Sequence, residues 1–155
     1  MGKLADRLAG QIKAAMHGPA WHGPALFEII DDLSAEEASA KPLSFAHSIW
    51  EIVLHLNAWD KAIPLRLGDT LVELTGDDDW PPCRDTSAAA WNAMKSALQN
   101  DSKQLRDAIR ALSDDDLNKS VPGHPFDNYV MLSGIPQHIL YHSGQIALLK
   151  KALRA

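Results

Sequence analysis

Hydrophobic residues recur along the chain with the three- and four-residue spacing of amphipathic helices, and this pattern fills four long stretches. The first stretch covers residues 4–15, is interrupted at residues 17–19, and resumes over residues 24–33. The interruption and the restart each carry a Gly-Pro pair, and proline lacks the amide donor that a helix interior needs. The pattern therefore predicts a first element that is kinked or broken.

The second stretch opens with a capping signal and ends before a long polar segment. Ser48 and Glu51 have the spacing of a capping box and precede a strongly apolar run, which should end between residues 64 and 68. From residue 68 to residue 85 the chain holds a glycine, a run of three aspartates and a Pro-Pro pair, which is typical of a surface loop. Loops of this length are uncommon in compact domains and often line a site.

The third and fourth stretches are the longest. Apolar residues keep near-heptad spacing from about residue 85 to residue 112, and the fourth stretch runs from about residue 128 to residue 153. Pro136 lies inside the fourth stretch and predicts a kink or a restarted helix there. Because no segment alternates with period two, the sequence predicts an all-α four-helix bundle, with residues 1–155 as a single domain.

Charge and cysteine content limit the partners and the compartment. A formal net charge of -5 repels phosphate backbones and anionic lipid surfaces, so we expect neither nucleic acid nor a membrane as partner. No segment approaches the roughly 20 apolar residues that cross a bilayer. Cys83 is the only cysteine and cannot form a disulfide within one chain, which favours a cytoplasmic location.

Two histidines stand four residues apart in the fourth stretch. Such positions lie about 40° apart around a helix, so His138 and His142 project from one face, about one turn apart. Apolar neighbours such as Ile139 and Ile146 flank this face and direct it to the bundle interior. His55 lies on the inward stripe of the second stretch. A buried imidazole needs a partner, and three neutral ring nitrogens can ligate one metal ion together.

The histidine pair alone leaves a second interpretation open, in which both are core histidines bonded to backbone carbonyls. A third inward histidine on another helix favours the metal, because clustered histidine is the usual signature of a transition-metal site. Three protein ligands leave coordination positions open for water or substrate. Imidazole accepts zinc, nickel, iron and manganese, so we expect a divalent transition metal, with zinc as the first choice.

The residues between the paired histidines bear on which reaction a metal site could catalyse. They are Ile139, Leu140 and Tyr141, so the pair lacks the glutamate base of H-E-x-x-H metalloproteases. The interior glutamates and Glu-x-x-His pairs of di-iron carboxylate bundles are also absent. Activation of a thiol suits the site better than peptide hydrolysis, because a metal-bound thiolate is already deprotonated.

Three residues are candidates for contact with the ligands or with a bound cofactor. Gln145 lies one turn beyond His142 and Tyr141 lies beside it, so either could hydrogen-bond an imidazole or a bound molecule. For Tyr141 a surface or helix-interface contact is the simpler explanation. Trp59 lies one turn after His55 and could form a pocket wall.

Two further residues are candidates for catalysis. Glu51 lies one turn before His55 and could orient it or move a proton, although its capping box already explains it. His22 stands beside a Gly-Pro pair at a helix start and could reach the mouth of the site as a fourth ligand or substrate contact; an exposed turn is the simpler explanation.

Two motifs carry a resemblance to a known family. "HSIWEIVLHLNAW" and "GIPQHILYHSGQIALLKKA" together resemble the DinB-like (DinB/YfiT) superfamily of bacterial metal-binding four-helix bundles, over residues 21–153. The resemblance implies a metal held by His55, His138 and His142, and a long crossover between the second and third helices. It also implies a homodimer.

The same resemblance implies a metal-dependent enzyme that transfers a low-molecular-weight thiol, such as bacillithiol or mycothiol, or water to a small electrophilic substrate. The alternative is a non-catalytic bundle that binds a metal or small ligand, for example in a stress response. The segment "AWHGPAL" and Pro136 depart from the family's commonest pattern, so the substrate does not carry over.

Overall fold

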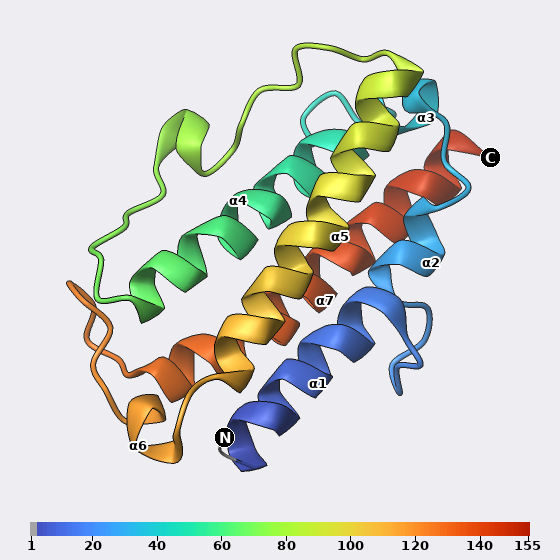
Figure 1. Ribbon diagram of the computed structural model, residues 1–155. Coiled ribbons are helices and arrows are strands. Elements are labelled where there is room, and N and C mark those ends of the chain that lie inside the picture. The colour runs from blue at the N-terminus through green and yellow to red at the C-terminus, as the bar shows by residue number, and fades with distance from the viewer. Residues whose placement is uncertain (1–2) are drawn as a thin grey trace.

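The computed structural model describes residues 3–155, and all regular structure in this range is helical (Figure 1). The all-α prediction is therefore confirmed. Four long helices form the bundle: α1 (Lys3–His17), α4 (Ile49–Leu67), α5 (Ala88–Arg110) and α7 (Asn128–Leu153). The connections hold short elements: α2 (Leu26–Ile30), α3 (Ala35–Ser39), the 3-10 turn η1 (Gly76–Asp78) and α6 (Asp114–Leu117).

The first element is broken, as the Gly-Pro pairs predict. α1 ends at His17, and Gly18 follows it with a positive φ of 73°, a conformation that favours glycine. α2 then begins at Leu26, where the Glu28 carboxylate accepts a 2.7 Å hydrogen bond from the Ala25 amide. The chain therefore makes two separate helices where the hydrophobic pattern alone is almost continuous.

Side-chain caps set the starts of the other long helices. In α4 the Ser48 hydroxyl accepts from the Glu51 amide at 3.1 Å, and the Glu51 carboxylate accepts from the Ser48 amide at 2.9 Å. This is the predicted capping box. α5 begins after Ser87, two to three residues later than expected, because the Asp85 carboxylate accepts from the Ser87 amide at 2.9 Å and holds the preceding turn. The Asp127 carboxylate caps α7.

α7 passes through Pro136 without a break, so the predicted restart does not occur. Proline costs a helix interior about 3 kcal/mol. Leu132, Ile135 and Ile139 lie on either side of it and are all buried against the bundle. Burying one such side chain contributes about 1.5–3 kcal/mol, so the packing of this face outweighs the lost hydrogen bond.

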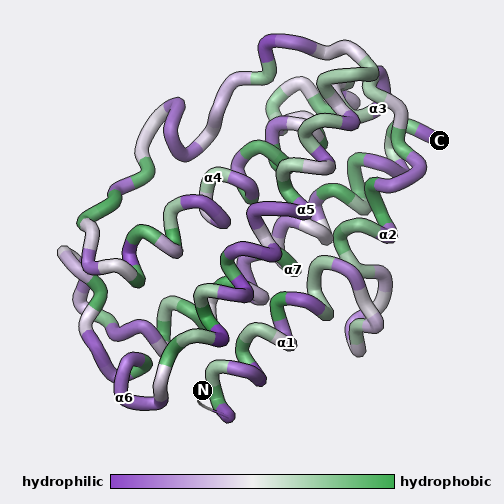
Figure 2. Tube along the Cα trace, viewed as in Figure 1, coloured by the Kyte–Doolittle hydropathy of each residue, from purple (hydrophilic) through white to green (hydrophobic). Residues whose placement is uncertain are grey.

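The core lies between the four long helices, and their outer faces are mostly polar (Figure 2). α5 contributes the near-heptad row predicted from sequence, with Trp91, Leu98, Leu105 and Ile109 fully buried. The Trp91 indole also donates a 2.9 Å hydrogen bond to the Leu33 carbonyl, which ties the α2–α3 segment to α5. No helix within residues 3–155 has the length and apolarity to cross a membrane.

The connection between α4 and α5 is a long crossover. The two helices are packed against each other and run in the same direction, so residues 68–87 must return along the length of the bundle (Figure 1). α4 also packs against α7. The crossover and the α4–α7 contact together position the residues described next.

Candidate metal centre

His55, His138 and His142 meet between α4 and α7, as predicted. One ring nitrogen of each lies within 4.8 Å of the corresponding nitrogens of the other two. The closest pair is Nε2 of His55 and Nε2 of His138, 3.0 Å apart. Imidazoles from two distant stretches of the chain are therefore brought to a single point by the packing of two helices.

Each histidine reaches this point from an apolar helix face. His138 and His142 are one turn apart on α7, where Ile139 and Ile146 are buried beside them. His55 is 5% exposed and lies next to buried Leu56 on α4. The spacing of the apolar residues thus turns all three rings inward.

Asp79 of the crossover fixes the orientation of His55. The His55 Nδ1–H donates to the Asp79 backbone carbonyl at 2.7 Å, and the carboxylate oxygen Oδ1 is 3.1 Å from the same nitrogen. The Trp59 indole donates to that carboxylate at 2.9 Å. A proton held at Nδ1 leaves the Nε2 lone pair of His55 free to face the other histidines.

Gln145 fixes the orientation of His142 in the way that Asp79 fixes that of His55. The His142 Nδ1–H donates to the Gln145 side-chain oxygen at 2.7 Å. The contact to a ligand imidazole that was expected of Gln145 is therefore present. Its role toward a bound molecule stays a prediction.

Trp80, also from the crossover, lies flat between two histidine rings. Its ring centroid is 4.0 Å from that of His55 and 3.8 Å from that of His47, with interplanar angles of 6° and 8°. Trp59 contacts the site from the α4 side, with its ring edge-on to His138 at 5.6 Å. Trp59 therefore forms the pocket wall that its position on α4 suggests.

Glu51 does not orient His55; that position is taken by Asp79. The Glu51 carboxylate instead accepts from the Ser48 amide, pairs with Lys41 at 3.0 Å and lies 3.3 Å from Nδ1 of His47. The capping box explains this arrangement, because it holds the carboxylate at the start of α4. A proton-transfer role for Glu51 stays a prediction, and the structure gives it no direct contact with the three histidines.

His22 lies outside the site and Tyr141 lies at its outer edge, as the simpler explanation of each predicts. His22 is exposed in the α1–α2 loop, and it lines neither of the two cavities that open onto the histidines. A turn carrying a Gly-Pro pair projects outward here, so its position in sequence does not bring it to the mouth of the site. Tyr141 is 66% exposed, with its ring edge-on to His142 at 5.0 Å.

The surroundings of His138 and His142 favour their uncharged form. Burial, together with the neighbouring His142 and His55, lowers the pKa of His138 to about 4. Burial also lowers the pKa of His142, although its bond to Gln145 opposes this. At neutral pH His138 and His142 therefore offer lone pairs, the form that binds a metal.

One of the nitrogen–nitrogen distances in the cluster already matches the spacing of two ligands on one metal ion. At a zinc–nitrogen distance of about 2.0–2.1 Å, two ligands on neighbouring coordination positions lie about 3.0–3.4 Å apart. The 3.0 Å between the Nε2 atoms of His55 and His138 falls at the short end of that range. Three imidazoles without a carboxylate ligand suit a transition metal better than magnesium or calcium.

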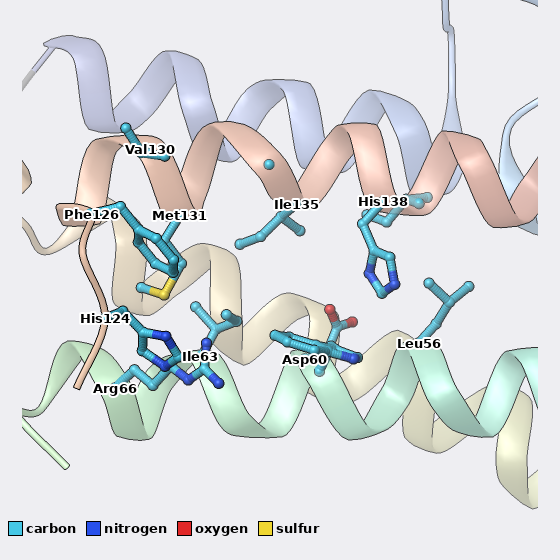
Figure 3. Close-up of a pocket in the computed structure, with 13 residues that line it drawn as sticks. Leu56, Asp60, Ile63, Arg66, His124, Phe126, Val130, Met131, Ile135 and His138 are labelled. Carbon is cyan, nitrogen blue, oxygen red and sulfur yellow. The ribbon is translucent and has the colours of Figure 1, made fainter. Parts of the chain in front are cut away.

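Two cavities open onto the three histidines, one between α4 and α7 and the other between α7, the segment before α4 and the crossover. One has a volume of about 440 Å³ and includes His138 in its wall (Figure 3). The other has a volume of about 350 Å³ and is lined by His142, Trp80, Tyr141 and Gln145. A ligand entering either cavity can therefore reach the histidines.

The sequence also matches the model of a known protein family. The model for the DinB superfamily matches residues 20–145. The chain belongs to the DinB superfamily. The match covers most of the DinB-superfamily bundle, including the three histidines and Gln145, and leaves α1 outside. No curated protein and no solved structure gave a match.

Two residues of this DinB-superfamily site were missed by sequence reasoning. Asp79 is the last of a run of three aspartates, and Trp80 follows it in a loop. A loop has no periodicity that fixes the direction of a side chain, so only the structure shows them against His55. The acidic run followed by tryptophan, in a loop long enough to line a site, was the available signal.

Proposed function

We propose that this DinB-superfamily chain binds a divalent transition metal through His55, His138 and His142 and uses it to activate a thiol. The observation that supports this is the set of three converging imidazoles, two of which have Nδ1 occupied by Asp79 or Gln145. Such hydrogen bonds select the tautomer that ligates through Nε2. The nitrogen ligand set favours zinc, with nickel, iron and manganese as alternatives.

The bound metal would supply Lewis-acid chemistry, lowering the pKa of a thiol or a water molecule so that a nucleophile exists at neutral pH. The protein's own residues would do the rest. Trp59 and Trp80 exclude water from the ligand nitrogens, and the two cavities hold the reactants. The thiol sulfur attacks an electrophilic carbon, the leaving group departs with the bonding electron pair, and the thiol proton passes to solvent.

A thiol is favoured over water because two carboxylates near the site, Asp79 and Glu51, already have partners. The Asp79 carboxylate contacts His55 and accepts a hydrogen bond from Trp59. Glu51 is held by Ser48, Lys41 and His47. A thiol loses its proton on metal binding, whereas hydrolysis needs a base to direct the water molecule.

The same observation supports the second candidate, a non-catalytic protein that binds a metal or a small ligand. A metal site whose nearby carboxylates already have partners is sufficient for storage or sensing. Turnover separates the two functions. The metal-loaded protein should be assayed with bacillithiol, mycothiol or cysteine as the thiol and 1-chloro-2,4-dinitrobenzene as the electrophile, and a rate no higher than that of the metal-free protein would favour the second candidate.

The metal itself is tested by elemental analysis of protein purified without an affinity tag. We expect the wild-type chain to carry metal and His138→Ala to lose it. His22→Ala is the matched control, because it removes an exposed histidine outside both cavities and should keep its metal. Equal metal content in wild type and His138→Ala would exclude the proposed site.

A further inference from the structure

The cavity on the His138 side is elongated and mostly apolar. It lies between α4 and α7, and its middle is lined by Ile63 and Ile135, both of them buried (Figure 3). His138 stands toward one end, and Arg66 and His124 stand at the other. Met131 and His138 are seven residues apart on α7, so the cavity runs for about 10 Å along the helix.

Arg66 is a buried cation at the far end of this cavity. It is 4% exposed, and its Nε and Nη2 both donate to the Val72 carbonyl, at 3.0 and 2.7 Å. The guanidinium also lies over the Trp59 ring, 5.1 Å from its centroid. Within residues 3–155 no carboxylate forms an ion pair with it. Only the more distant Glu73 partly offsets this buried charge, so an anion in the cavity would be stabilised here.

His124 adds a polar group without a partner at the same end. Its Nε2 atom is buried and has no hydrogen-bond partner among the described residues. The ring is held in place by stacking on Phe126, with centroids 5.0 Å apart. A ring N–H at Nε2 would find an acceptor if a ligand oxygen were present beside Arg66.

Asp60 does not neutralise Arg66. Burial and the nearby Asp101 raise the pKa of Asp60 to about 8, and Arg106 only partly offsets them. At neutral pH the Asp60 carboxyl is therefore mostly protonated. Its buried Oδ2 has no partner among residues 3–155, so it is available to donate or accept a hydrogen bond within the cavity.

We propose that this cavity binds a small molecule with an elongated apolar body and one terminal carboxylate. The carboxylate lies against Arg66 and His124, the body packs along Ile63, Met131 and Ile135, and the other end reaches His138. One guanidinium matches one negative charge, so a carboxylate is favoured over a phosphate dianion, whose second charge would be buried without compensation. Only the placement of the reacting end beside His138 rests on the proposed function.

The proposal is tested with three probes that share one apolar body: octanoate, 1-octanol and octylammonium. Their binding to the metal-free protein should be measured by titration calorimetry at pH 7. We expect octanoate to bind about tenfold or more tightly than 1-octanol, because it adds charge-assisted hydrogen bonds, and octylammonium to bind more weakly than either.

Three outcomes would overturn it. Equal affinity for the three probes would mean an apolar slot without an anion site. Tightest binding of octylammonium would mean that Asp60 acts as an anion toward ligands. Absence of octanoate binding would mean that the cavity takes no such ligand. None of these outcomes depends on the metal, so they leave the elemental analysis of His138→Ala to decide the proposed function separately.

Substitutions at Arg66 and His124 test whether the carboxylate of octanoate binds there. Arg66→Gln should weaken octanoate binding about tenfold and leave 1-octanol unchanged, and His124→Phe should weaken octanoate severalfold while keeping the stack on Phe126. Lys103→Gln is the control, because it removes an exposed cation on α5 and should change neither affinity. If both cavity variants fold and bind octanoate like wild type, the proposed anion site is wrong.

A measurement on the wild-type chain covers the case in which Arg66→Gln does not fold. In protein labelled with ¹³C at the methionine methyl groups, octanoate should shift the signal of Met131, which lines the cavity. The signal of Met16, buried in the core on α1, should stay in place. A shift of neither signal, or of both equally, would contradict binding in this cavity.

Discussion

The His55 imidazole lies flat on the Trp80 indole, with centroids 4.0 Å apart and ring planes within 6° of parallel. Trp80 belongs to the crossover, whereas His55 belongs to α4. A connection that only had to return the chain along the bundle therefore contributes directly to the site. The predictions below test what each such contact does.

Trp80 should shield and orient His55. Trp80→Ala removes one face of the stack and admits water, so we expect a fall in zinc affinity of severalfold to about tenfold. Trp80→Phe keeps a flat ring and should retain most of the affinity. Competition titration with a fluorescent zinc chelator measures both, and identical affinities for wild type and Trp80→Ala would show that the stack is incidental.

Gln145 should set the tautomer of His142. Gln145→Ala removes the acceptor of the Nδ1 proton, so we expect zinc affinity to fall about 10–100-fold. Gln145→Glu keeps an acceptor and should bind zinc at least as tightly as wild type. The same chelator competition applies, and an unchanged affinity in Gln145→Ala would remove Gln145 from the site.

The metal-free protein should lose stability in mild acid through His138. Its folded pKa of about 4 lies below the unfolded value of 6.5, so the unfolded state binds more protons as the pH falls from about 6.5 to 4. Because the ring is half-buried, we expect a loss of about 1–2 kcal/mol over this range. Urea unfolding of wild type and His138→Gln at pH 7 and pH 4.5 checks it, since the variant should lose less.

Asp60 should have the opposite effect at higher pH. Its folded pKa of about 8 lies above the unfolded value of 3.8, so the unfolded state alone releases the proton as the pH rises between these values. Stability is therefore lost from about pH 4 to pH 8. Asp60→Asn should melt at a higher temperature than wild type at pH 8, and this advantage should shrink toward pH 4. A constant difference at all pH values would contradict the raised pKa.

The helices and the three histidines could be predicted because both follow from local periodicity. The four-residue spacing of His138 and His142 fixes their common face, and the apolar stripe of α4 turns His55 inward. The restart predicted at Pro136 does not occur, because tertiary packing on both sides of it keeps the helix continuous. The observed start of α5 differs from the predicted one by two to three residues, because hydrophobic periodicity does not indicate which residue, here Ser87, caps the helix.

The polar groups around the histidines could not be predicted, because their directions depend on contacts between distant segments. Asp79 and Trp80 come from a loop without periodicity. Arg66 looks like an ordinary cation in the last turn of a helix, and only the fold shows that it is buried beside His124. Burial of a charge is a property of the assembled structure, and no neighbour in the sequence indicates it.

His55 and His138 touch although 83 positions of the chain separate them. A metal ion bound to both would close a loop of that length, as a disulfide does. Unlike a disulfide, this link can be removed with a chelator. Unfolding would then have to release the ion first, so the melting temperature of the protein would rise with the concentration of free metal.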